Sequence, residues 1–118
     1  MSSYNLNQKT FVLVQNSENG KVNSETLFKY KQKQNTVWAT YAGGPILYGT
    51  IFGHLKGEQL SLLYQCLTYT HELKAGKAIA TVSKTSSNKL KLSLEWEWIN
   101  GGKEKGSSEY VEIDTIIK

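Results

Sequence analysis

The segment Lys89–Trp98 alternates strictly between polar and apolar residues. One phase holds only leucine and tryptophan, and the other holds only lysine, serine and glutamate. Because side chains on a β-strand point alternately to opposite faces, this segment can bury one face and expose the other only if it is extended. It therefore predicts a half-buried β-strand. We expect the buried face to include Leu92, Leu94 and Trp96 and the exposed face to include Lys91, Ser93 and Glu95.

Short apolar or aromatic runs bounded by Gly, Asn or Ser recur along the rest of the sequence, without the apolar spacing of a helix. Asn-Gly and Gly-Gly pairs between the runs permit the positive φ angles of short hairpins, so neighbouring strands should pair antiparallel. We predict strands at Thr10–Gln15, Glu25–Lys31, Thr36–Ala42, Ile46–His54, Gln59–Thr68, Leu73–Val82, Lys89–Trp98 and Ser107–Ile113.

A meander of these strands leaves two exposed edges unless the first strand pairs with the last. Gly49 and Gly53 lie inside the fourth predicted strand, where glycine often marks a bend of a small barrel. We therefore predict an all-β fold, an eight-stranded antiparallel up-and-down meander closed or nearly closed into a barrel. An open sheet or a two-sheet sandwich of the same strands is the alternative.

The composition is that of one soluble domain. At 118 residues the chain can form a single hydrophobic core, so we expect one domain over residues 1–118, with residues 1–9 flexible or loosely packed. No apolar run is long enough for a membrane span, the first residues lack the pattern of a secretory signal, and Cys66 is the only cysteine. We therefore expect a cytoplasmic protein that does not act at a membrane.

The chain has 14 lysines, no arginine and a formal net charge of +4. Arginine supplies the planar forks that read guanine edges and clamp phosphates, whereas lysine is a solvated point charge. This basic composition therefore favours a soluble surface, and we expect no nucleic-acid partner.

No residues form a recognisable catalytic or metal-binding pattern. His54 and His71 have no Cys-x-x-Cys or His-x-His partner, and Cys66 lies in the apolar phase of its predicted strand, where it would fill the core. Glu95 and Glu97 lie about 6.5 to 7 Å apart by strand rise, a separation that some glycosidases use but that any two outward residues share. We predict no catalytic residue, no metal and no cofactor.

The aromatic residues are the strongest indication of a function. An eight-stranded barrel is just wide enough to be filled by side chains or to hold one small ligand. Trp and Tyr in such an interior bring N–H and O–H groups that need partners and can bind a ligand. The alternative is that these rings only fill the barrel. We predict a ligand site walled by Trp38, Tyr48, Tyr64, Trp96 and Trp98.

The stretches Val-Trp-Ala-Thr-Tyr-Ala-Gly-Gly at 37–44 and Glu-Trp-Glu-Trp at 95–98, with the spacing of Gly49, Gly53 and Gly76, are the most specific motifs of the chain. Over residues 20–106 the sequence resembles a group of small bacterial proteins of unknown function. The resemblance implies a calycin-like barrel of the lipocalin or avidin kind. Proteins of this group often carry the label N-acetylglutamate synthase.

The residues themselves do not support acetyl transfer. An acetyltransferase of the usual kind needs a Gly-rich loop at a helix N-terminus for the coenzyme's pyrophosphate, and arginine suits the two carboxylates of glutamate. The sequence offers neither. We predict instead a protein that binds a small, partly apolar molecule. The alternatives are an enzyme of unknown type and an interaction domain with a filled core that pairs through an exposed edge strand.

Overall fold

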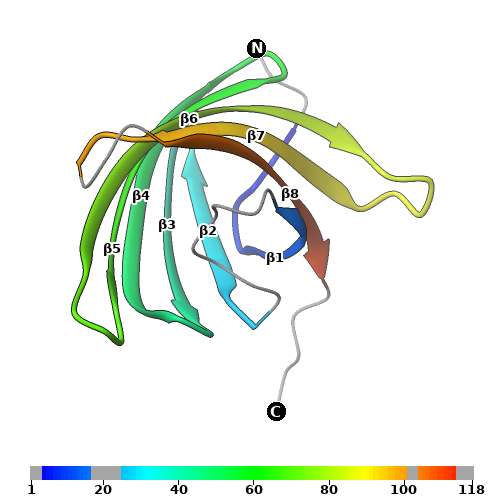
Figure 1. The fold of residues 1–118 in the computed structure, drawn as a ribbon. Helices are drawn as coiled ribbons and strands as arrows, with labels where there is room; N and C mark the ends of the chain where they lie inside the picture. The colour runs from blue at the N-terminus through cyan, green and yellow to red at the C-terminus, as the bar shows by residue number, and fades with distance from the viewer. Residues whose placement is uncertain (1–3, 17–24, 101–103, 114–118) are drawn as a thin grey trace.

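The structure, a computed structural model, describes residues 4–16, 25–100 and 104–113 (Figure 1). Each predicted strand is present, and no strand end differs from its predicted position by more than two residues. No helix that could cross a membrane occurs in the described residues. The strands are β1 (Lys9–Asn16), β2 (Leu27–Lys33), β3 (Thr36–Gly43), β4 (Ile46–Lys56), β5 (Gln59–Thr68), β6 (Leu73–Lys84), β7 (Leu90–Trp98) and β8 (Lys105–Ile113).

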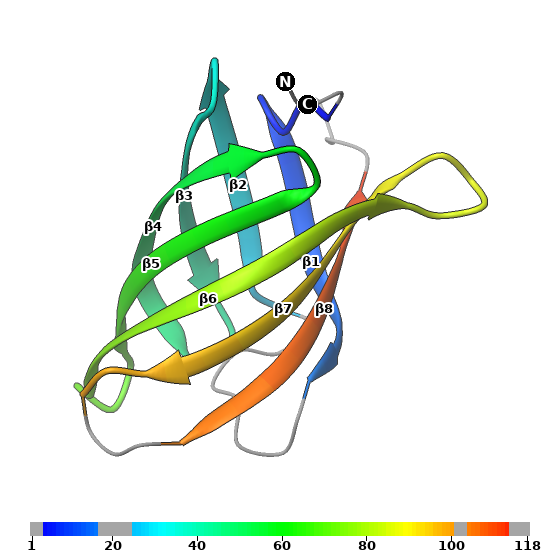
Figure 2. The ribbon, with the colours of Figure 1, turned by 90° about the horizontal axis from the view of Figure 1, so that it is seen from above.

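The strands form a closed barrel in sequence order, and every neighbouring pair is antiparallel (Figures 1 and 2). The ring closes where β1 pairs with β8, with Thr10 opposite Ile113 and Leu13 opposite Tyr110. The predicted closed barrel is therefore confirmed, and the open-sheet and sandwich alternatives are wrong. Because all eight strands have neighbours on both sides, none of them is an exposed edge strand that could pair with another molecule.

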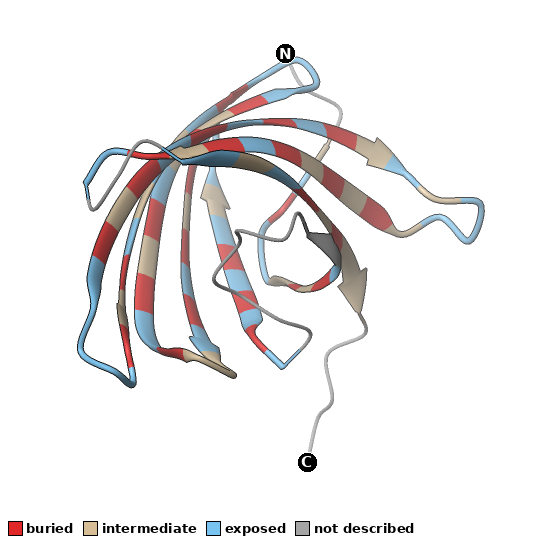
Figure 3. Cartoon of the chain, in the orientation of Figure 1, coloured by how far each residue is buried: buried red, intermediate tan, exposed pale blue. Residues whose placement is uncertain are grey.

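Burial alternates along the strands as the sequence pattern predicts (Figure 3). In β7, Leu92, Leu94 and Trp96 expose 8% of their surface or less. Glu95 is exposed, and the other outward positions of this strand are partly exposed. The predicted register of β7 is therefore confirmed.

Small residues on β6 make room for the large residues that face the interior from β7. Ala78 lies opposite Trp96, and Ala80 lies opposite Leu94. Gly76 lies opposite Trp98, and also opposite Tyr64 on the other neighbouring strand. Since the barrel has a fixed width, pairing small with large side chains lets the interior reach the density of a protein core.

Gly49 has a more specific role than a bend in the strand. It lies opposite Tyr41, and a Cβ atom at this position would overlap the Tyr41 ring. The absent side chain therefore creates the space in which an inward tyrosine lies.

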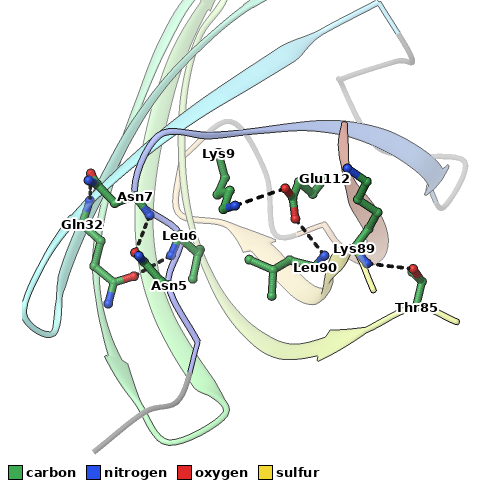
Figure 4. A network of polar contacts seen from close by, with 9 residues as sticks. All are labelled: Asn5, Leu6, Asn7, Lys9, Gln32, Thr85, Lys89, Leu90 and Glu112. Carbon is green, nitrogen blue, oxygen red and sulfur yellow. Dashed lines mark hydrogen bonds and ion pairs between the residues drawn. The ribbon is translucent and has the colours of Figure 1, made fainter. Parts of the chain in front are cut away.

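One end of the barrel is closed by the segment that precedes β1, and we call it the Leu6 end. Leu6 is fully buried, and its N–H donates to Gln32 Oε1 at 2.8 Å. The Gln32 N–H donates to Asn7 Oδ1 at 3.1 Å (Figure 4). Leu6 therefore anchors the segment before β1 to the barrel, while Asn5, Asn7 and Gln8 beside it are exposed and residues 1–3 lie outside the described residues.

Polar contacts also join β8 to its two neighbours, β1 and β7. Glu112 on β8 forms an ion pair of 3.4 Å with Lys9 and accepts a hydrogen bond of 3.0 Å from the Leu90 N–H (Figure 4). Lys91 pairs with Glu109 at 3.5 Å. These contacts are partly exposed, so we assign closure mainly to the β1–β8 backbone pairing and the shared core.

We predict that Trp96→Ala lowers the free energy of unfolding by about 3 to 5 kcal/mol, because it removes a buried indole from the core. The matched control is Glu95→Ala, one residue away on the outer face. This variant should change the free energy of unfolding by less than about 0.5 kcal/mol. Urea denaturation of the three proteins measures both values. Equal losses in the two variants would contradict the register of β7.

Candidate functional site

The barrel interior changes character from one end to the other. Near the Leu6 end it is mainly aliphatic, whereas the opposite end, which we call the Trp98 end, holds rings and polar groups. The Leu6 end contains Leu6, Phe11, Tyr30, Val37, Leu55, Leu60 and Val82, and the rings of Phe11 and Tyr30 pack edge to face. The Trp98 end contains Tyr41, Tyr64, Cys66, Lys74, Trp96, Trp98 and Ser108.

Two tryptophans and a tyrosine form the centre of the Trp98 end. The Trp98 ring centroid lies 5.6 Å from that of Trp96 and 5.7 Å from that of Tyr64. Trp96 Nε1 donates a buried hydrogen bond of 2.8 Å to Ser108 Oγ, which fixes the Trp96 ring. Tyr64 is only partly buried, so its ring lies at the margin of the packed core.

Trp98 has no such partner for its indole N–H. Its Nε1 is buried, and it forms no hydrogen bond within the described part of the chain. The indole nitrogen is only a donor. Leaving a buried donor unsatisfied costs about 1 to 3 kcal/mol, so this position is expensive in the folded protein.

Lys74 lies beside this indole. It points inward from β6, exposes only 6% of its surface, and places Nζ 4.7 Å from the Trp98 ring centroid. It forms no hydrogen bond or ion pair with any residue in the described ranges. A cation–π contact is worth about 0.5 to 2 kcal/mol, whereas desolvating a charged group costs several kcal/mol. The contact with the Trp98 ring is therefore weaker than the cost of fully desolvating an ammonium group.

Lys74 was missed in the sequence analysis, although a signal for it exists. The inward phase of its strand reads Lys74, Gly76, Ala78, Ala80, Val82, in which lysine is the one charged residue. Read as an alternating strand, this segment places a cation inside the barrel.

The inward tyrosines are held in their neutral form. Burial raises the pKa of Tyr41 well above its ordinary value, and the neighbouring Cys66 thiol raises it further. The Tyr41 hydroxyl donates to the Gln65 carbonyl oxygen at 3.1 Å. Burial also raises the pKa of Tyr64, with a smaller contribution from Tyr110. At neutral pH these hydroxyls are therefore hydrogen-bonding groups without charge.

The structure brings together three of the five residues predicted to wall a ligand site, namely Tyr64, Trp96 and Trp98. Trp38 and Tyr48 lie elsewhere. Trp38 lies opposite Lys31 and Phe52, which are exposed on the outer face, and Tyr48 is 55% exposed. The assignment of Trp38 and Tyr48 to the interior was therefore wrong.

The reason is the phase of each strand. Val37, Ala39 and Tyr41 take the inward positions of β3, which puts Trp38 outside. In β4 the register shifts between Ile46 and Tyr48, so the residues after this irregularity change faces.

The histidines and the paired carboxylates lie outside the interior cluster. His54 is exposed on β4, and His71 lies in the β5–β6 turn with φ 68°. Glu95 and Glu97 line a groove of about 690 Å³ on the outer face of β5–β8, where Glu97 pairs with Lys77 at 3.2 Å. Within the described residues, no three His, Cys, Asp or Glu side chains are grouped to hold a metal ion.

The fold and the interior cluster define a closed eight-stranded barrel with an aromatic, polar end. A family model described as avidin-like protein matches residues 4–113. The chain therefore belongs to the avidin-like family. No curated protein matches the sequence.

We predict that the protein loses stability above about pH 10. Burial raises the pKa of Tyr110 to about 12, while a hydrogen bond with Ser108 lowers it. An unfolded tyrosine ionises near pH 10, so above that value the unfolded state binds fewer protons than the folded state. The stabilisation is complete below about pH 10 and is lost progressively as the pH rises towards 12.

Denaturant unfolding at several pH values between about 8 and 11 measures this loss. Tyr110→Phe should reduce the steepness of the decline, since phenylalanine does not ionise. A free energy of unfolding that stays constant or rises over this range would contradict the burial of these hydroxyls.

Proposed function

We propose that the protein binds a small, partly apolar molecule at the Trp98 end of the barrel interior. The observation that carries this proposal is the contrast between the two ends. Aliphatic side chains and the ring pair of Phe11 and Tyr30 fill the Leu6 end, whereas the Trp98 end places Lys74 and an unpartnered indole N–H among aromatic rings.

Stability alone does not account for these polar groups. An apolar residue of similar size at position 98 would avoid the cost of burying an unsatisfied donor, and one at position 74 would avoid placing a lysine side chain in the interior. Proteins accept such costs at functional sites. Membership of the avidin-like family adds support, since a closed barrel of eight strands can hold one small ligand.

The cluster is also arranged to recognise a ligand with little rearrangement. Ser108 fixes the Trp96 indole, and Gly49 fixes the space of the Tyr41 ring. Aromatic faces supply contact area for an apolar body, and rigid side chains lose little entropy on binding. As a further part of this proposal, the protein binds its ligand in the cytoplasm.

Tryptophan fluorescence tests the proposal, because Trp96 and Trp98 lie in the proposed site. A panel of small molecules with an apolar body and one polar group is titrated into the protein. Biotin is included because the matching family is described as avidin-like. We expect a saturable change with at least one compound.

Trp96→Phe should weaken that binding, whereas Trp38→Phe on the outer face should leave the affinity unchanged. Absence of a saturable signal across the panel, or equal weakening by the two variants, would count against an interior site.

We also predict that acetyl-CoA and glutamate, alone or together, give no saturable fluorescence change and no N-acetylglutamate. The reason is that the chain has no arginine for the two carboxylates, and the described strands present no helix N-terminus for a pyrophosphate. Product formation measured by mass spectrometry would overturn this prediction.

A further inference from the structure

We propose that the Trp98 end selects ligands with a carboxylate, which Lys74 Nζ and Trp98 Nε1 hold between them. This inference rests on the proposed function and adds the chemical class of the ligand. It also assigns a binding role to Lys74, whose side chain has no other polar contact in the described part of the chain.

The first step is the position of the two donors. Lys74 and Trp98 lie on neighbouring strands, β6 and β7, and both side chains point inward at the same end. Their contact places the ammonium nitrogen 4.7 Å from the indole ring centroid. Gly76 lies directly opposite Trp98, and the hydroxyl end of Tyr64 occupies the space that a side chain at this glycine would take.

The second step is that neither group can satisfy the other. A lysine ammonium offers three donors and no acceptor, and an indole nitrogen offers one donor and no acceptor. Of the two, the indole N–H is buried without a partner, so an acceptor for it must come from outside the pair. The described residues supply none to either group.

The third step is that the acidic residues of β7 belong to the other face. Glu95 and Glu97 occupy the outward phase of β7, and Glu97 is paired with Lys77. Cys66, which lies opposite Lys74 on β5, contributes a thiol, which is a weak acceptor. No carboxylate among the described residues forms an ion pair with Lys74, so a carboxylate that enters with a ligand would supply that partner.

The fourth step is why a carboxylate fits better than a neutral oxygen. Hydrogen bonds to a charged acceptor are roughly twice as strong as neutral ones, and a carboxylate has two oxygens for the two donors. The rings of Tyr64 and Trp96, which surround Trp98, would contact the apolar part of the molecule. The expected ligand is thus a small monocarboxylate with an apolar body.

Isothermal titration of the wild-type protein with matched pairs of probes tests this directly. The pairs are phenylacetate with phenylacetamide, 4-phenylbutyrate with its amide, and hexanoate with its amide. In at least one pair the affinity for the carboxylate should exceed the affinity for the amide by about tenfold or more, as expected for a charge-assisted hydrogen bond.

Lys74→Met keeps the length of the side chain without its charge and should abolish the preference for the carboxylate. The matched control is Lys77→Met, which changes a lysine three residues along the same strand on the outer face. This variant should keep the preference for the carboxylate. Trp98→Phe should reduce the preference in part, because it removes only the N–H. If Lys74→Met does not fold, the wild-type comparison of each acid with its amide still decides.

Equal affinities for acid and amide in every pair would overturn the carboxylate inference and leave the proposed function standing. A preference that persists in Lys74→Met would overturn the role of Lys74. If no probe of either kind binds, both the inference and the proposed function are contradicted for molecules of this class.

Discussion

The closure of β1 onto β8 is the constraint on which the rest of the structure depends. Once the ring is closed, every inward residue competes for one space of fixed width. The sequence meets this limit by placing small inward residues opposite large ones on neighbouring strands. Gly49 admits the Tyr41 ring, and Gly76 lies between Tyr64 and Trp98 on its two neighbouring strands. The aromatic end of the interior exists because these glycines leave room for it.

The same closure explains why Lys74 is informative. On an open sheet an inward lysine could turn towards an edge, but a closed ring commits it to the interior beside Trp98. The Leu6 end meets the same geometric demand with aliphatic residues and a segment that covers it. The two ends therefore differ in the chemistry of their side chains within the same barrel. Membership of the avidin-like family establishes the barrel fold but does not identify the ligand.

The sequence predicted the fold well because period-two alternation and turn residues are local signals. The register of β7 could be read residue by residue, as Leu92 and Trp96 show. The site was harder to predict, since both phases of β3 carry apolar residues and an irregularity in β4 changes its phase. Counting aromatic residues without assigning their faces placed Trp38 and Tyr48 inside. The covering of one end by Leu6 depends on contacts with β2 that leave no periodic pattern in the sequence.

The indole N–H signals of ¹⁵N-labelled protein test the central claim most directly, because the three tryptophans occupy three different environments. Trp38 lies on the outer face, Trp96 donates to Ser108, and Trp98 has no hydrogen-bond partner in the described residues. On titration with phenylacetate, the Trp98 signal should move furthest downfield and saturate, while the Trp38 signal should stay in place. A Trp98 signal that does not move while the carboxylate binds would contradict the account.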